Sequence, residues 1–363
     1  MLANPGQAEA RHTLPMNEPL TPAQTVLAPQ WLMLQVANAN LLNLALPGRA
    51  FYPGQDPYDA HEHERKLAWL GGMLARLNAD VVGFQEVWDE VALKAAVARS
   101  GLRYTTVAAP GAETGAIGTP RLGLATRLAV EHIETLADFA TAERVVVPEL
   151  GEYSRFERPV LHARLRSQHG PRPGTALHVL VVHLKSKRPK YLQDAAGNAL
   201  EDRDDPAITA RATLRSLLMR GAEAAALRRV VVNITSRRGA QGGEPLVLLG
   251  DMNDGPHSVT SQMIAATQAV AYDRGARDVA LYHAWDVATE PALKRDMAYS
   301  HVHQGWPELL DQIWVSEEFV ATSRFAIGDV KRVEVFNDHL HESRERWRSD
   351  HGFVRALLRM RTA

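Results

Sequence analysis

Nine short apolar segments, spread between residues 32 and 358, constrain the fold of this chain more than any other feature. Each is five to eight residues long and rich in Val, Leu, Ile or Tyr, which is typical of buried β-strands. Longer amphipathic stretches stand between several of them, and this alternation predicts an α/β fold. The expected strands cover residues 32–37, 80–84, 104–109, 121–127, 159–165, 176–183, 244–250, 311–316 and 352–358.

Amphipathic stretches predict three helices. The clearest covers residues 60–78, where leucines recur at spacings of three and four and so form one apolar stripe. A second helix is expected near residues 207–235, and a shorter one over residues 88–99. The stripe of the first helix consists of Leu67, Leu70, Leu74 and Leu77.

The distribution of Pro and Gly predicts the domain organisation. Residues 1–29 contain five prolines and no periodic pattern, so we expect an N-terminal tail or surface arm. No stretch between residues 30 and 360 has the composition of an interdomain linker, which favours a single α/β domain over residues 30–360. Loops are expected over residues 109–120, 185–206 and 236–244.

The composition of the 363 residues excludes several classes of protein. Lys+Arg 41 against Asp+Glu 42 gives a net charge of −1, so no global field draws the chain to nucleic acid or to an anionic membrane. Because the chain has no Cys, it has no disulfides, no thiolate zinc site and no cysteine nucleophile. No apolar run approaches the roughly 20 residues of a membrane span. The first twenty residues lack a signal peptide, so we expect a cytoplasmic protein, with secretion after removal of a leader as the alternative.

Residues capable of metal or phosphate chemistry stand at the ends of several expected strands. If the sheets are mixed or antiparallel, the ends of some strands and the starts of others share one rim. Carboxylates gathered there repel one another, so a hard cation or a proton must compensate them. At strand ends these residues are Asn40, Gln85, Glu86, His183, Asp251, Asn253 and Asp254, and at strand starts Asp311, Asp350 and His351.

Each of these residues taken alone has a simpler explanation. Asn40 is a common type of turn residue, and Glu86 suits the first turn of the following helix. A lone histidine after an apolar strand, such as His183, is more often a hydrogen-bonded rim residue than a catalyst. Asp251 opens a turn that does not fit a calcium loop, because its twelfth position is Gln262 and not Glu. Only the set as a whole indicates a site, and no HExxH, Walker A or GxSxG motif competes with it.

Six motifs carry a resemblance to a known family. NANLLNL, VVGFQEVWD, VVHLKSK, LVLLGDMND, LDQIWVS and SDHGFV follow one another between residues 31 and 357. This series resembles the endonuclease/exonuclease/phosphatase superfamily, and most closely its bacterial nuclease-like or phosphodiesterase-like branch. The resemblance implies a four-layer α/β/β/α sandwich of two mixed β-sheets with outer helices, and a site at one rim.

The resemblance also implies a metal site. Glu86 matches the main Mg²⁺ ligand of the family, Asn40 the amide beside it, and Asp350 the acid next to the metal. Carboxylates with water and a substrate phosphate are the usual surroundings of Mg²⁺, and Mn²⁺ can take its place. One-metal and two-metal versions both fit the sequence.

The remaining motif residues match catalytic positions of the family. His183 matches a phosphate-contacting residue, and Asp251 with Asn253 matches the pair that activates and orients the attacking water. Asp311 matches the carboxylate that holds the histidine of the SDH motif, here His351. An Asp–His pair favours the protonated imidazole, which places positive charge against the transition state. Whether Asp251 or His351 accepts the proton is left open.

The substrate is less constrained by the sequence. Lys185, Lys187 and Arg188 follow the third motif and are candidate substrate-binding residues that track a phosphate backbone, with a solvated loop as the alternative. Aromatic residues make up 6% of the chain, so no stacking platform for single strands is evident. His301 and His303, in YSHVHQG, are interpreted as part of an exposed strand or loop rather than as ligands.

Three functions are compared on these observations. The first is a Mg²⁺-dependent phosphodiesterase, taken to be a nuclease of DNA or RNA. The second is a phosphatase or phospholipase-C-type hydrolase of a small phosphorylated molecule or lipid headgroup, which the near-neutral charge favours. The third is a non-catalytic scaffold, which the intact acid and histidine set disfavours. No feature of the sequence indicates a protein partner.

Overall fold

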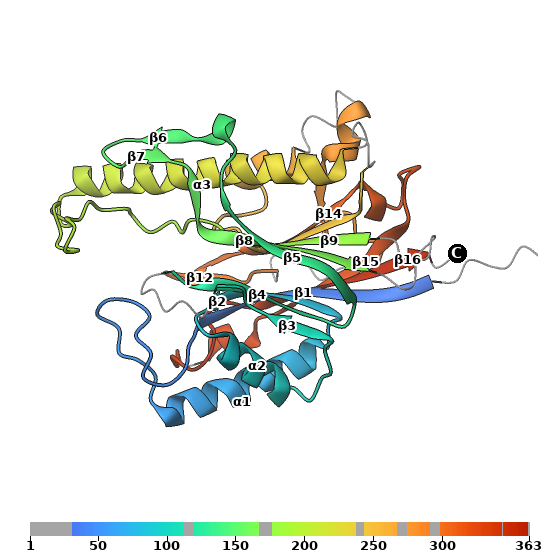
Figure 1. The fold of residues 1–363 in the computed structure, drawn as a ribbon, viewed down its shortest axis with the longest axis horizontal. Coiled ribbons are helices and arrows are strands. Elements are labelled where there is room, and N and C mark those ends of the chain that lie inside the picture. Colours follow the sequence, from blue (N-terminus) through green and yellow to red (C-terminus); the bar gives the residue numbers. More distant parts are fainter. Residues whose placement is uncertain are drawn as a thin grey trace, which may run out of the picture.

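Two six-stranded β-sheets lie face to face at the centre of the computed structural model, with helices on their outer faces (Figure 1). The structure describes residues 31–111, 119–166, 176–236, 243–266, 274–290, 298–342 and 344–361. The tail expected over residues 1–29 lies outside the described residues. In Figure 1, α3 crosses one face of the paired sheets and α1 and α2 cover the other. These layers confirm the predicted α/β/β/α sandwich.

The first sheet has the strand order β15-β16-β1-β2-β4-β3, and the second has the order β11-β14-β10-β9-β8-β5. The first sheet consists of β1 (Trp31–Leu44), β2 (Val81–Val87), β3 (Thr106–Ala108), β4 (Arg121–Thr126), β15 (Gly328–Phe336) and β16 (Phe353–Arg361). The second consists of β5 (Ala129–Asp138), β8 (Arg155–Arg166), β9 (Ala176–His183), β10 (Leu246–Asp251), β11 (Leu281–His283) and β14 (Asp311–Ser316). Two hairpins stand outside the sheets, β6 (Val145–Val147) with β7 (Gly151–Tyr153) and β12 (His301–His303) with β13 (Trp306–Glu308).

The helices form where the amphipathic pattern predicts them. The α-helices are α1 (Ala60–Leu77), α2 (Glu90–Arg99), α3 (Pro206–Thr235) and the short α4 (Val259–Ala265), which the sequence pattern did not predict. A capping box starts α1, because Asp59 accepts from the Glu62 amide at 2.7 Å and Glu62 accepts from the Asp59 amide at 3.2 Å. Short 3₁₀ turns cover Thr141–Glu143, Arg274–Val279, Glu317–Phe319 and Asp338–His341. No helix in the described ranges is long and apolar enough to cross a membrane.

All nine predicted strands overlap strands of the structure, and two long strands were missed. β5 and β15 lie at the outer edges of the two sheets, where many of their side chains are only half-buried. An edge strand buries less of each residue, so its sequence carries more polar side chains and a weaker apolar signal. Prediction from apolar runs therefore finds the central strands and only one edge strand, β3, while it misses the edges β5, β11 and β15.

Two parallel strand pairs place the helices outside the sandwich. β1 and β2 run parallel, and so do β9 and β10, whereas the other neighbours in both sheets are antiparallel. Parallel neighbours need a crossover connection, and α1 and α3 provide the two crossovers. Each crossover helix packs its apolar side on the outer face of its sheet.

This topology brings the chemistry-bearing residues to one rim. The carboxyl ends of β1, β2, β9 and β10 meet the amino ends of β14 and β16 there, as the sequence predicts. In the second sheet Asp251 pairs with His183 on one side and with Asp311 on the other. In the first sheet Asn40 pairs with Gln85. Strand register alone therefore fixes the backbone of the candidate site.

A glycine sets how closely the two sheets approach. Gly83, on β2, faces Leu249 on β10 and Val181 on β9. A Cβ at this position would lie 2.1 Å from a methyl of Leu249 and 3.0 Å from the Val181 methyls. The interior is close-packed at this point, and no larger side chain fits without movement of the sheets.

We predict that Gly83→Ala lowers the free energy of unfolding by about 1–3 kcal/mol, because the added methyl overpacks the space between the sheets. Gly72→Ala is the matched control, since Gly72 lies on the exposed side of α1 and a Cβ added there would meet nothing within 4 Å. That change should stabilise by roughly 0.5–1 kcal/mol through helix propensity. Urea unfolding of both variants measures the difference, and equal stability of the two would contradict the packing argument.

Candidate active site

A cavity of about 750 Å³ opens at the shared rim of the two sheets. Most of the residues expected at the site line it, from β2, the ends of β9 and β10, the loop after β9 and the segment before β16. The lining residues among those predicted are Glu86, His183, Lys187, Arg188, Asp251, Asn253, Asp350 and His351. Asn40, Asp311 and Lys185 do not line it, but Asn40 hydrogen-bonds Asp251 and Asp311 hydrogen-bonds His351 in its wall.

The imidazole of His351 is held by Asp311. His351 Nδ1 lies 2.7 Å from Asp311 Oδ2, and because a carboxylate only accepts, Nδ1 carries the proton of this bond. The other oxygen of Asp311 accepts from Asn38 Nδ2 at 2.9 Å, and Asn38 in turn accepts from Gln85 Nε2 at 2.7 Å. Burial lowers the pKa of His351, but the carboxylates of Asp311 and Asp251 outweigh it and raise that pKa well above 6.5.

Asp251 stands opposite, at the end of β10. Its Oδ1 accepts from the Asn253 amide at 2.8 Å, and its Oδ2 accepts from Asn40 Nδ2 at 3.2 Å. His183 Nε2 lies 3.4 Å from the same oxygen, and His351 Nε2 lies 3.9 Å from it. Burial raises the pKa of Asp251, and the nearby Asp311 raises it further. A carboxylate with a raised pKa is a stronger base, which suits proton abstraction from water.

The end of β2 bends so that Glu86 reaches the cavity. The register of β1 and β2 shifts between Asn40 and Leu44, and Glu86 has a φ of 60°. Non-glycine residues with a positive φ of this size are uncommon, and they cluster at functional sites. The Asn43 amide donates to Glu86 Oε2 at 3.0 Å and so holds the carboxylate in place. Burial raises the pKa of Glu86, and the second carboxylate, Asp350, raises it further.

These carboxylates fit a hard divalent cation. Glu86 and Asp350 both line the cavity and destabilise each other's charge, which a cation between them would relieve. Two further sets have ligand atoms within 4.8 Å of one another, namely His301, Asp350 and His351, and Asp251, Asp311 and His351. The Asn40 oxygen already accepts from the Leu42 amide at 3.2 Å, so its contact with an ion remains a prediction.

The SDH motif is tied to β1 by its serine. Ser349 Oγ donates to the Asn40 carbonyl at 2.6 Å and accepts from the His351 amide at 3.0 Å. These bonds set the position of Asp350 between them, on the exposed side of the turn. The short motif therefore joins the last strand of the chain to the first.

Sequence reasoning missed Arg158, which lies near the start of β8. Its Nη1 donates to the carbonyls of His183 and Leu184 at 3.4 and 3.2 Å, and its Nε has no partner among the described residues. Burial, with the charge of Arg158, lowers the pKa of His183 well below 6.5, so this imidazole is neutral. The signal was available, because the start of a strand antiparallel to β9 must lie at the rim.

His301 was also missed as a site residue. Its ring centroid lies 4.8 Å from that of His351, and the two residues form an isolated antiparallel bridge. His301 and His303 both line the cavity. The interpretation of this pair as an exposed strand or loop is right about the strand, but it overlooks the bridge to the SDH motif.

The three predicted substrate-binding cations differ in their surroundings. Arg188 is exposed and lines the cavity. Lys187 also lines it, but its Nζ pairs with Glu308 at 2.5 Å. Lys185 is buried, and its Nζ lies 4.0 Å from Glu157, outside the cavity. Among the three, Arg188 is thus the best placed to meet an anionic substrate.

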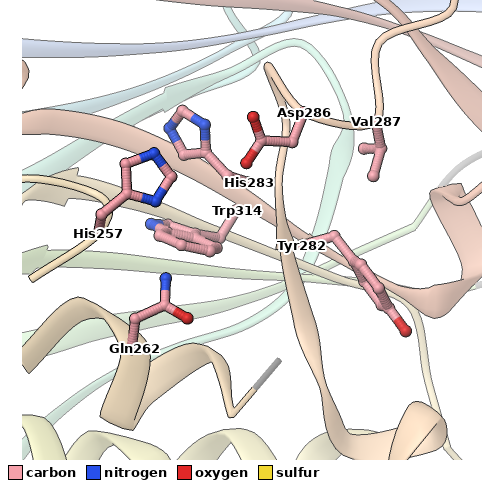
Figure 2. Close-up of a pocket in the computed structure, with 7 residues that line it drawn as sticks. All are labelled: His257, Gln262, Tyr282, His283, Asp286, Val287 and Trp314. Atoms are coloured by element: carbon pink, nitrogen blue, oxygen red, sulfur yellow. The ribbon is translucent and has the colours of Figure 1, made fainter. Parts of the chain in front are cut away.

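A smaller cavity of about 360 Å³ lies between α4 and β11 (Figure 2). His257, His283 and Trp314 gather on one side of it, while none of the predicted site residues lines it. Trp314 Nε1 donates to Gln312, whose amide donates to the Asp254 carbonyl at 2.6 Å. Gln312 therefore supports the turn after β10. The acids and imidazoles line the larger cavity, which is therefore the candidate active site.

Comparison with known proteins agrees with this geometry. The model of the endonuclease/exonuclease/phosphatase family matches residues 64–351, and the chain belongs to this family. Its members are phosphoester hydrolases that generally use divalent metal ions. No curated protein matches the sequence.

Several solved structures share the fold. The human nocturnin catalytic domain with bound sulfate has 16% identity and a TM-score of 0.51, over 91% of this chain and 97% of that one. A mannosyl-6-phosphatase from Bacteroides thetaiotaomicron has 13% identity and a TM-score of 0.51, over 90% and 99%. An endonuclease/exonuclease/phosphatase family protein from the same organism has 14% identity and a TM-score of 0.52, over 92% and 97%. At these identities the similarity establishes the fold alone.

We predict that His351 of the metal-free protein titrates above 6.5 and that Asp311→Asn lowers its pKa. Because the folded pKa is raised, the stability it contributes is fully present below pH 6.5 and is lost as pH rises through the folded value. In Asp311→Asn, the free energy of unfolding should therefore fall less as the pH rises above 6.5. Nuclear magnetic resonance titration in EDTA measures the pKa of His351, and thermal unfolding over a pH series in EDTA measures the stability. Titration of native His351 at or below 6.5 would contradict the assignment.

Proposed function

We propose that this protein is a metal-dependent phosphodiesterase that cleaves nucleic acid. The observation that carries the proposal is the facing pair of groups at the rim, with the Asp311-held imidazole of His351 on one side and the buried carboxylate of Asp251 on the other. Such a pair supplies a base for water and a positive charge for the phosphate within one cavity.

The chain's own residues account for the movement of the proton. Asp251 accepts a proton from the attacking water, whose oxygen forms the new bond to phosphorus while the bond to the leaving oxygen breaks. Asn253 fixes Asp251 through its backbone amide. His351, protonated and held by Asp311, stabilises the charge that builds on the non-bridging oxygens. His183 is neutral and can hydrogen-bond the phosphate from the other side of Asp251.

A divalent cation completes this proposal. Glu86 would hold it, with Asp350 and Asn40 beside it, and Mg²⁺ or Mn²⁺ is the ion expected from carboxylate and amide oxygens. When bound, the ion would screen the charge of the phosphate and stabilise the leaving oxygen. Arg158 adds a fixed positive charge from β8, since its guanidinium lies at the cavity wall beside His183.

A monoester phosphatase is the alternative, and one observation favours it. Lys187 is paired with Glu308, and the arginines in the described lining of the cavity stand among acids such as Glu342 and Glu345. The described lining is therefore of mixed charge, unlike the continuous basic stripe expected of a strong duplex binder. The fold is also shared by a mannosyl-6-phosphatase. A small phosphorylated sugar or a lipid headgroup would then be the substrate.

The deciding experiment compares three substrates in EDTA, Mg²⁺ and Mn²⁺, namely bis(p-nitrophenyl) phosphate, p-nitrophenyl phosphate and plasmid DNA. We expect metal-dependent cleavage of the diester and the plasmid, and a loss of about 10²- to 10⁴-fold in Asp251→Asn, because the general base is removed. Asp329→Asn is the matched control, since Asp329 pairs with Arg359 at the opposite end of the sandwich. Cleavage of the monoester alone would favour the phosphatase, and full activity in EDTA would exclude the metal.

We predict that Arg188→Glu weakens binding of DNA and reduces the slope of log K against log salt by about one, because one phosphate contact is lost. Lys187→Glu should have a smaller effect, since Lys187 is already paired with Glu308. Arg103→Glu serves as the control, because Arg103 is exposed in the loop before β3, at the far rim. Fluorescence anisotropy over a salt series measures the slopes, and equal slopes for the native chain and Arg188→Glu would show that this loop is only solvated surface.

A further inference from the structure

The β12–β13 hairpin is built into the candidate active site at its base. His301 bridges His351, and the Gly352 amide donates to the Ser300 carbonyl at 2.6 Å. Ser300 Oγ accepts from the Asp311 amide at 2.9 Å. The base of the hairpin is therefore hydrogen-bonded to the two motifs that carry Asp311 and His351.

The tip of the hairpin is a two-residue turn with little conformational freedom. Gln304 and Gly305 both have positive φ, at 49° and 85°. Such turns match the twist of the flanking strands and give a rigid hairpin. A residue next to this turn is held in a fixed place relative to His351.

Strand register places Trp306 on the same side of the hairpin as three residues that line the cavity. Residues directly opposite each other in an antiparallel pair project to the same face, and so do residues two apart on one strand. His301 pairs with Glu308 and His303 pairs with Trp306, so all four share a face. His301, His303 and Glu308 line the cavity. Trp306 itself does not line the cavity; it lies across the hairpin from His303 and is 76% exposed.

The rings on this face form a row that begins at the catalytic histidine. The centroids of His351 and His301 are 4.8 Å apart, and those of His301 and His303 are 6.4 Å apart with ring planes within 16°. Trp306 is the cross-strand partner of His303 in the hairpin, so its side chain projects from the same face. A row of flat faces of this length exceeds what one sugar ring would cover, and it suits several planar groups in succession.

We propose that this row, made of His301, His303 and Trp306, is a stacking platform for the bases that flank the scissile phosphate. The inference deepens the proposed function, on which it rests, by specifying a base-containing strand as the substrate. Every base has a π-face, so stacking of this kind tolerates any sequence.

The test is the binding of two fluorescein-labelled strands of equal length and charge, one with bases and one made of abasic sugar phosphates. Binding is measured by anisotropy on Asp251→Asn protein, which is not expected to cleave them. We expect Trp306→Ala to weaken binding of the base-containing strand about tenfold and to leave binding of the abasic strand unchanged. Trp306→Phe should retain most of the affinity, because it keeps an aromatic face.

Trp31→Ala is the matched control, since Trp31 is 37% exposed at the start of β1, at the opposite end of the sandwich. It should not change the affinity for either strand. The platform is excluded if Trp306→Ala binds the base-containing strand as tightly as its parent, if it loses affinity for both strands equally, or if the parent binds neither strand. Failure of the proposed function has a separate sign, namely no cleavage of any diester by the native chain with metal.

Discussion

The hydrogen bonds that cross between the two sheets are the contacts on which the site depends. Gln85 and Asn38 on the first sheet reach Asp311 on the second, and Asp311 holds His351. Gln85, Asn38 and Asp311 are completely buried, so none can exchange its partner for water. A buried polar group left without a partner costs far more than a surface bond contributes. The same bonds therefore fix the spacing of the sheets and the orientation of the imidazole.

The central strands were predictable from sequence because both of their faces are buried, which requires continuous apolar runs. β9 and β14 coincide with their predicted ranges for this reason. Edge strands carry no such requirement, and β5 and β15 escaped prediction. The grouping of Glu86, Asp251 and His351 at one rim was also predictable, because it follows from sheet geometry and chain direction.

Other parts of the site depend on tertiary contacts that no local pattern records. Arg158 is one charged residue among several on β8, and only the antiparallel pairing with β9 brings it to His183. His301 reaches the cavity through a single bridge to His351. Lys185 and Lys187 look equivalent in sequence, yet one turns toward Glu157 and the other toward Glu308. Fold similarity at under 20% identity leaves these differences undetermined, so the substrate has to be argued from the chain's own residues.

The pairing of β1 with β16 has a consequence for how the protein is made. Trp31 on β1 pairs with Arg361 on β16, so the first sheet cannot complete its strand pairing until β16 has been synthesised. During synthesis Glu86 and Asp251 emerge from the ribosome long before His351. A nascent chain can fold much of the second sheet, but it carries the acids without their imidazole partner. The proposed hydrolytic centre is thus absent from nascent chains in which the segment around His351 has not yet been synthesised.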